Sequence, residues 1–173
     1  MGNEPQFEEL FLPFLNAAYN LARWIVHNEQ DAQDVVQEAY LRAFKGFRSG
    51  NSKAWLLTIV RNTAYSYLRK WGEGDRLVPY EEGKHADITA FDFAATENVS
   101  EQIKEELKNA LRRLPAKLRE IIVLYEFEGL SYSEVALILG VPIGTVMSGL
   151  SRARQGLQQE FFQPPGGEAA NEL

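Results

Sequence analysis

Apolar residues recur every three or four positions through the first part of the chain, which is the spacing of amphipathic helices. Pro13 is expected to kink or restart the first helix. A second helix follows the capping residue Asn28 and ends near Gly46, and a third covers about residues 54–71. The pattern predicts a compact three-helix domain over residues 1–72.

The periodicity is lost at residues 73–99, where acidic residues mix with Gly, Pro and Thr, as in a flexible linker. Ser100 then caps one helix, Pro115 opens the next, and two shorter helices complete a domain over residues 100–163. Residues 164–173 are predicted to be a disordered tail. No stretch alternates like a strand, so the sequence predicts an all-α fold: two small helical domains joined by a flexible acidic linker.

Residues 131–146 have the pattern of a helix-turn-helix, so the second domain is predicted to be a helix-turn-helix domain. Ser131 and Glu134 are spaced as a capping box, Gly140 permits a tight turn, and Val146 fills the angle between the helices. The second helix would present polar and basic residues to a DNA major groove and its phosphates, namely Thr145, Ser148, Ser151, Arg152 and Arg154. A plain helical hairpin is the alternative interpretation of this segment.

Composition excludes several classes of protein. The chain has 173 residues, 45% hydrophobic and 24% charged, which is typical of a folded globular protein. With no cysteine and two histidines 58 positions apart, no disulfide, metal site or cofactor is expected. No apolar run is long enough to cross a membrane, and the amino-terminal residues resemble neither a signal peptide nor a myristoylation motif. We therefore expect a cytoplasmic protein without membrane insertion.

Charge is segregated along the chain, although the net charge is −6. Residues 46–72 carry five basic and no acidic groups, whereas residues 73–99 carry two basic and seven acidic groups. On the third predicted helix, one arc combines basic, aromatic and amide side chains, and the opposite arc is apolar. The arc contains Trp55, Thr58, Arg61, Asn62, Tyr65, Ser66 and Arg69.

This combination suits single-stranded nucleic acid, because cations bind phosphates while aromatic groups stack on bases. The preceding polar loop, residues 47–53, is placed to close around an unstacked base. An ordinary solvated basic face explains the spacing equally well. On the second helix, Asp34, Gln37, Glu38 and Leu41 form a ridge opposite the buried side, which alone is typical of a solvated surface.

The order of these patterns resembles the extracytoplasmic-function (ECF) sigma factors of bacterial RNA polymerase, group IV of the sigma-70-like family. The resemblance covers nearly the whole chain. Residues 31–38 are similar to the family's polymerase-docking helix and residues 55–62 to its promoter-melting helix. Four segments resemble the family's second DNA-binding domain, namely Leu114-Pro115, Arg119-Glu120, Gly144-Thr145-Val146 and Ser151-Arg152-Ala153-Arg154.

The resemblance implies that residues 1–72 form sigma domain 2 and residues 100–163 form sigma domain 4. Contacts to core RNA polymerase, through its beta-prime and beta subunits, are then expected from Asp31, Asp34, Val35, Gln37, Glu38 and Leu41. Reading and melting of the promoter's minus-10 element is expected from Phe47, Arg48, Asn51, Ser52, Lys53, Trp55, Arg61, Asn62, Tyr65, Ser66 and Arg69. Duplex recognition of the minus-35 element is expected from Ser131, Pro142, Gly144, Thr145, Ser148, Ser151, Arg152 and Arg154. The resemblance further implies an anti-sigma factor as a partner, and we expect the free chain to be a monomer.

The chain departs from the family pattern at three positions. The family commonly has basic residues where this chain has Met147 and Gly149, and an acidic residue where it has Ser66. Each missing phosphate contact lowers DNA affinity and its salt dependence. We therefore expect weaker minus-35 binding than is usual in the family.

Two other functions are compatible with parts of the sequence. A conventional helix-turn-helix transcription regulator would explain the second domain but not the basic, aromatic helix of the first, and it would not bind polymerase. A helical enzyme would need a pocket with perturbed acids or bases, for which no motif is present, so no enzymatic activity is expected.

Overall fold

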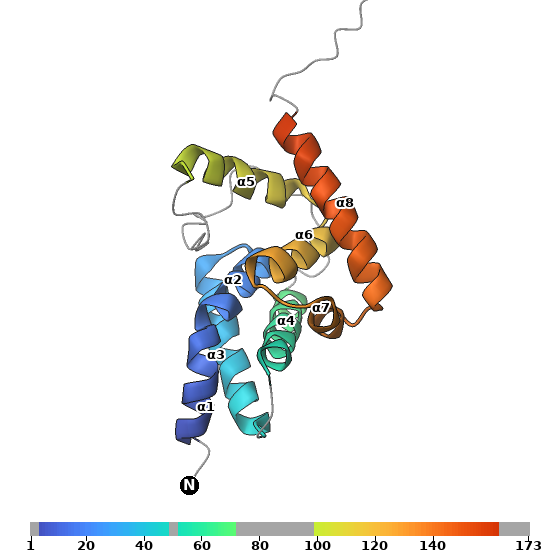
Figure 1. The fold of residues 1–173 in the computed structure, drawn as a ribbon. Coiled ribbons are helices and arrows are strands. Elements are labelled where there is room, and N and C mark those ends of the chain that lie inside the picture. The colour runs from blue at the N-terminus through green and yellow to red at the C-terminus, as the bar shows by residue number, and fades with distance from the viewer. Residues whose placement is uncertain (1–3, 49–51, 72–98, 163–173) are drawn as a thin grey trace, which may run out of the picture.

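The computed structural model describes residues 4–48, 52–71 and 99–162, all of them in helices and short connections (Figure 1). The predicted all-α fold is confirmed. The predicted linker and tail lie outside the described residues, apart from residue 99. Across the described residues no single helix is long and apolar enough to span a membrane, although the helices Tyr132–Leu139 and Ile143–Phe161 pass that test as a pair bent by 100°.

The first unit contains four helices and a short 3-10 turn: α1 (Glu4–Phe11), η1 (Leu12–Phe14), α2 (Leu15–Val26), α3 (Glu29–Gly46) and α4 (Lys53–Lys70). Pro13 lies in η1, so the expected interruption of the first helix is confirmed. The Asn28 side chain caps α3 by accepting a hydrogen bond from the Asp31 amide at 2.9 Å. The α2, α3 and α4 helices pack against one another in each pairing.

The second unit contains α5 (Glu101–Arg113), α6 (Ala116–Ile122), the π-helical turn η2 (Val123–Phe127), α7 (Tyr132–Leu139) and α8 (Ile143–Phe162). Ser131 and Glu134 form both hydrogen bonds of the capping box at the start of α7. Gly140 ends α7 with a φ of 66°, a left-handed conformation that glycine adopts without a steric penalty. The predicted helix-turn-helix is therefore present as α7, a tight turn and α8.

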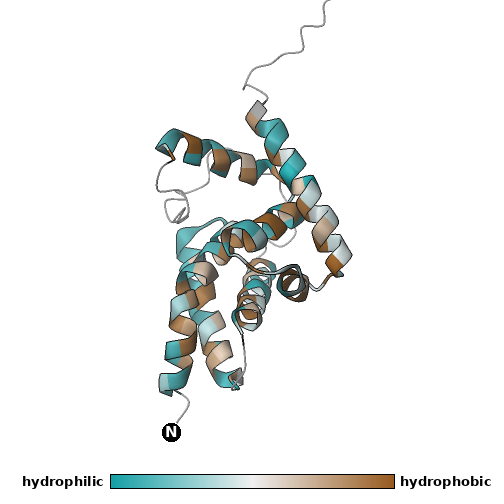
Figure 2. Ribbon diagram, viewed as in Figure 1, coloured by the Kyte–Doolittle hydropathy of each residue, from teal (hydrophilic) through white to brown (hydrophobic). Residues whose placement is uncertain are grey.

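The two units share one continuous apolar core rather than forming two separate ones. The α4 helix of the first unit packs along α7 of the second, and α2 contacts α6 (Figure 1). Figure 2 shows apolar and polar residues alternating along the helices of both units, as in amphipathic helices. Because each unit is too small to bury a large core alone, this shared burial contributes to the stability of both.

Candidate nucleic-acid and polymerase interfaces

The polar arc of α4 lies at the boundary between the two units. Asn62 and Arg69 are exposed, whereas Arg61, Tyr65 and Ser66 are half-buried. The Ser66 hydroxyl accepts a hydrogen bond from Arg69 Nη2 at 3.1 Å. The arc is thus a real feature of the folded chain, but only part of it faces solvent.

Glu120 of α6 lies at that boundary and contacts two residues of α4. Its Oε2 accepts a hydrogen bond from Arg61 Nε at 2.7 Å, and its Oε1 accepts one from the Tyr65 hydroxyl. The Glu120 side chain is 5% exposed. Burial and the neighbouring Glu120 carboxylate raise the pKa of Tyr65, since both disfavour the charged phenolate. Two side chains expected to bind DNA therefore already bind an acidic group of the second unit.

The segment before α4 differs from the expected open, base-binding loop. Phe47 is buried and packs edge-on against the rings of Phe7 and Phe11, so it belongs to the core. Ser52 caps α4 by accepting a hydrogen bond from the Trp55 amide at 3.3 Å. Direct base contact by Phe47 is therefore corrected to a packing role.

The other residues expected at this site have mixed surroundings. The Lys53 ammonium donates to the Glu128 carbonyl oxygen at 3.1 Å, so it too contacts the second unit. Trp55 is half-buried, with its ring 5.7 Å from that of Phe11. Arg48 is exposed, and Asn51 lies outside the described residues.

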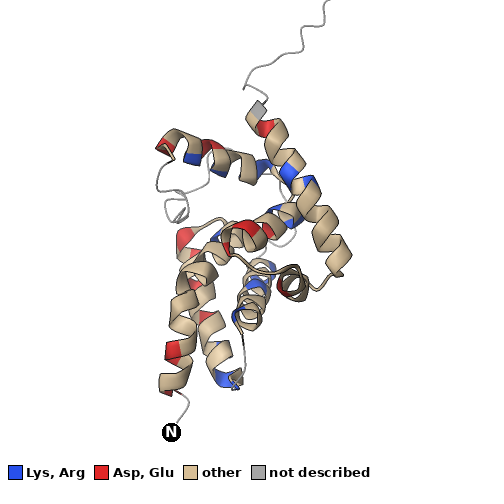
Figure 3. Cartoon of the chain, in the orientation of Figure 1, with Lys and Arg blue, Asp and Glu red and all other residues tan. Residues whose placement is uncertain are grey.

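The acidic ridge of α3 is on the surface. Asp34, Gln37, Glu38 and Leu41 are all exposed, and Leu41 is 58% exposed despite its apolar side chain. Figure 3 shows acidic groups along the first part of α3 and basic groups at its end, whereas the charged groups on α4 are basic. The ridge residues are exposed with both units present, so the second unit leaves the ridge accessible.

Two residues expected to contact polymerase do not lie on that exposed face. Val35 is 1% exposed and packs in the core, because it falls on the inner side of α3. Asp31 is half-buried and accepts a hydrogen bond from the Tyr67 hydroxyl at 2.8 Å, which ties α3 to α4. Val35 is therefore corrected to a core residue, and the Asp31 contact stabilises the helix pair.

The helix-turn-helix presents an open face along α8. Pro142, Gly144, Ser148, Ser151 and Arg152 are exposed, and Thr145 is half-buried. The Ser148 hydroxyl donates to the Thr145 carbonyl oxygen at 3.2 Å, and Ser131 uses its hydroxyl in the capping box. The expected groove-facing residues of α8 therefore share one accessible side of the helix.

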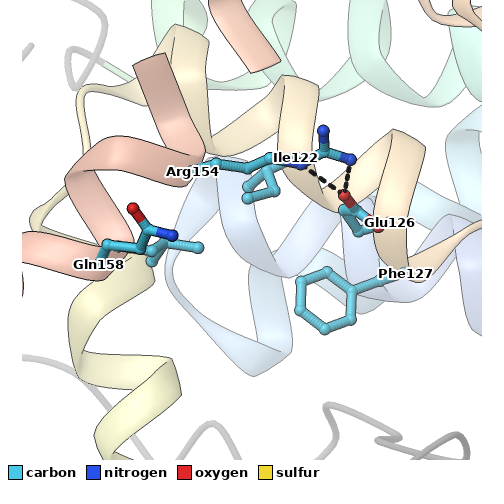
Figure 4. Close-up of a pocket in the computed structure, with 6 residues that line it drawn as sticks. Ile122, Glu126, Phe127, Arg154 and Gln158 are labelled. Carbon is cyan, nitrogen blue, oxygen red and sulfur yellow. Dashed lines mark hydrogen bonds and ion pairs between the residues drawn. The ribbon is translucent and has the colours of Figure 1, made fainter. Parts of the chain in front are cut away.

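Arg154 has a partner within its own unit. Its guanidinium forms an ion pair with Glu126 at the edge of a surface pocket of about 300 Å³, also lined by Ile122, Phe127, Leu157 and Gln158 (Figure 4). The hydrogen bond to Glu126 raises the pKa of the guanidinium. Both members of this pair are well exposed, at 51% and 40% of their side chains, so water competes for it.

Gly149 faces inward, which corrects the argument made for it from the sequence. It is buried, and a Cβ at this position would lie 2.4 Å from Cδ1 of Ile121 on α6. A Cβ at Gly156, two turns later, would lie 2.7 Å from Leu114 Cδ2. These glycines allow α8 to approach its neighbours closely, so Gly149 is not a missing phosphate contact. Met147 is 53% exposed, so the interpretation as a missing phosphate contact still applies to this position.

Sequence reasoning assigned no role to the residues of the second unit that contact the first. Besides Glu120 and Glu128, these include Arg119, whose guanidinium lies 5.8 Å from the centre of the Trp24 ring. Burial lowers the pKa of Arg119. The available signal was a pair of adjacent charges, Arg119 and Glu120, directly before the apolar residues that end α6. Among the described residues, no cluster of three or more metal-ligating side chains occurs.

The fold is thus that of a helical protein with a helix-turn-helix in α7 and α8 and a basic polar face on α4. Models of two sigma-70 families match the chain: sigma-70 region 2 over residues 10–72 and sigma-70 region 4 over residues 104–157. The chain is 32% identical over 168 residues to the RNA polymerase sigma-H factor of Pseudomonas aeruginosa, covering 91% of this chain and 87% of that protein. It is 34% identical over 172 residues to the ECF RNA polymerase sigma-E factor of Escherichia coli strain K12, with 92% and 88% covered.

Solved structures agree with these matches. The sigma factor RpoE of Bartonella quintana, crystallised with the anti-sigma factor NepR, superimposes with a TM-score of 0.67 at 33% identity, covering 90% of this chain and 96% of that one. CnrH, in complex with the cytosolic domain of CnrY, gives a TM-score of 0.65 at 25% identity, covering 92% and 90%. The chain belongs to the ECF sigma factors. It is an alternative sigma factor that directs promoter-specific transcription, in a family that binds core RNA polymerase and promoter DNA and is in general not enzymatic.

Proposed function

We propose that this sigma factor docks on core RNA polymerase through the exposed ridge of α3, opens the minus-10 element with α4, and reads the minus-35 element with α8. In this proposal residues 1–72 act as sigma domain 2, residues 100–163 as sigma domain 4, and residues 73–99 join them. The observation that carries the proposal is the segregation of three chemically distinct faces, one acidic, one basic and aromatic, and one on a helix-turn-helix.

The ridge of α3 suits a protein partner. Acidic side chains beside an exposed leucine offer both charge complementarity and apolar area, the combination that supports steered association and burial. The i,i+4 ion pair between Glu38 and Arg42, at 2.8 Å, is half-exposed and contributes little to folding. Glu38 can therefore exchange that partner for a cation on polymerase at little cost in stability.

The face of α4 suits an opened strand. Arg61 and Arg69 supply cations for phosphates, while Tyr65 and the half-buried Trp55 supply aromatic surface. Each base stacked on an aromatic side chain stabilises the captured strand by about 1–3 kcal/mol. Capture of this kind shifts the duplex toward the open form, so melting needs binding energy and no catalysis by this chain.

The face of α8 suits duplex DNA. Its exposed hydroxyls at Ser148 and Ser151, together with Arg152, match the donors that contact bases and phosphates in a major groove. The protein would act in the cytoplasm, where polymerase and promoters are. Since RpoE was crystallised with the anti-sigma factor NepR, we propose an anti-sigma partner for this chain as well.

The test is binding of the full chain to core RNA polymerase, followed by promoter-dependent transcription. An Asp34→Arg plus Glu38→Arg variant reverses the charge of the ridge and is expected to weaken polymerase binding at least about tenfold, because two favourable contacts become repulsive. Glu8→Arg plus Glu9→Arg, at exposed positions of α1, gives the same change in net charge and should bind like the wild type. Binding of the wild type to DNA but not to polymerase would overturn the proposal in favour of a conventional regulator.

A further inference from the structure

The covered face of α4 is the strongest feature that the proposed function leaves unexplained. Arg61 and Tyr65, one turn apart on α4, both donate to the carboxylate of Glu120. A carboxylate that accepts hydrogen bonds from an arginine and a tyrosine resembles a nucleic-acid phosphate. Both groups are anionic and accept hydrogen bonds through two oxygens. Glu120 therefore uses the groups that a single strand would need.

Other contacts hold the same boundary closed. Lys53, at the start of α4, donates to the Glu128 carbonyl oxygen and lies 3.5 Å from its carboxylate. Arg119, next to Glu120, lies over the Trp24 ring, and α7 packs along α4. The polar contacts to the second unit thus involve both the start and the middle of α4.

The apolar and the polar contacts of this boundary play different parts in closure. Ion pairs that leave water gain little net free energy, because desolvation of the charges offsets their attraction. The apolar surface shared by α2, α4, α6 and α7 supplies the driving force for closure, and Glu120 requires that Arg61 and Tyr65 lie opposite it. Opening would expose that apolar surface, which opposes separation, and would solvate Glu120, which favours it, so the two contributions act in opposite directions.

We propose that the second unit covers α4 in the free protein, with Glu120 as an internal competitor for the strand-binding groups Arg61 and Tyr65. The closed arrangement and a bound single strand are then mutually exclusive, and strand binding requires the units to separate. The inference rests on the proposed role of α4. The ridge of α3 and the outer side of α8 stay accessible in the closed form, so closure masks only one of the three proposed contacts.

The experiment measures the distance between the units and the affinity for a single strand in the same full-length chain. Because the sequence has no cysteine, Lys45→Cys and Gln155→Cys, both at exposed positions, give two unique sites for spin labels. The probe is a short fluorescein-labelled DNA single strand of mixed sequence. Glu120→Gln removes the charge and keeps the size of the side chain, and its folding is checked by thermal unfolding.

The expected result is a longer distance and roughly five- to tenfold tighter strand binding for Glu120→Gln, since apparent affinity scales with the open fraction. Adding the single strand to the wild type should lengthen the distance in the same way. Glu160→Gln, which removes the ion pair with Arg113 inside the second unit, is the matched control and should change neither measurement. The charge swap Arg61→Glu plus Glu120→Arg should restore the short distance but leave strand binding weak.

Two results would overturn the inference. Only the second would also overturn the proposed role of α4. An unchanged distance in Glu120→Gln, with strand binding still weakened by Arg61→Ala, would remove the competition and leave the role of α4 intact. A longer distance with the same strand affinity in wild type, Glu120→Gln and the swap would overturn both the competition and the assignment of the strand to α4.

Discussion

Two arginines proposed to contact DNA each bind a glutamate of the second unit, and the two pairs differ in burial. Arg61 and Glu120 are 21% and 5% exposed and join the two units, whereas Arg154 and Glu126 are 51% and 40% exposed and lie within one unit. Solvent screens the second pair but hardly reaches the first. In the proposed function, the same chemical contact is therefore an obstacle to DNA binding on α4 and a readily exchanged surface contact on α8.

The contrast extends to the helices that carry these arginines. The polar face of α4 is packed against another unit, while the outer face of α8 is open but has only two basic residues along the helix, Arg152 and Arg154. For the proposed DNA contacts, we therefore expect access to limit affinity at α4 and the number of cations to limit affinity at α8. Mutations that open the units and mutations that add charge should therefore act on different helices.

The largest expected effect comes from adding an arginine to the wrong side of α8. Gly149→Arg places a side chain against Ile121, with its Cβ at 2.4 Å from Cδ1 before any shift, and buries a charge. We expect the free energy of unfolding to fall by about 3 kcal/mol or more, from overpacking and desolvation together. Urea unfolding followed by circular dichroism measures it. Met147→Arg, on the exposed side, serves as the control and should unfold like the wild type.

The next effect concerns DNA binding by that same Met147→Arg variant. An added cation on the open face should supply one more phosphate contact, so the slope of log affinity against log salt should steepen by about 0.9 on duplex DNA. The measurement is a salt titration of the full chain with a duplex containing a minus-35 element. An unchanged slope would mean that the exposed side of α8 does not face the phosphates.

Local sequence rules predicted the elements well. Pro13, the Ser131–Glu134 capping box and Gly140 act through residues at most a few positions away, and each has the expected conformation. Helical periodicity failed where a side chain's environment depends on distant segments. Phe47 follows a helix in a polar stretch but is buried by α1, and Gly149 lies on the α8 side that meets α6.

The contact between units could not be predicted for the same reason. Arg61 and Glu120 are 59 positions apart and belong to different helices, and nothing in the spacing of either helix specifies that they meet. The arc of α4 and the ridge of α3 were found because each is complete within one helix. A site formed inside one element is thus accessible to sequence analysis, whereas a surface closed by a second unit becomes visible only in the folded chain.

The smallest expected effect concerns the ion pair between Arg154 and Glu126, which is the more exposed of the two pairs. Glu126→Gln should change the free energy of unfolding by no more than about 1 kcal/mol, since half-exposed ion pairs contribute little. It should also release Arg154, and the salt slope on duplex DNA should steepen by a fraction of the Met147→Arg effect, because water already competes for this arginine. Salt titrations of both variants with the same duplex make the comparison. A loss of stability as large as that of Gly149→Arg would show that the pair supports the fold, and the distinction drawn from burial would fail.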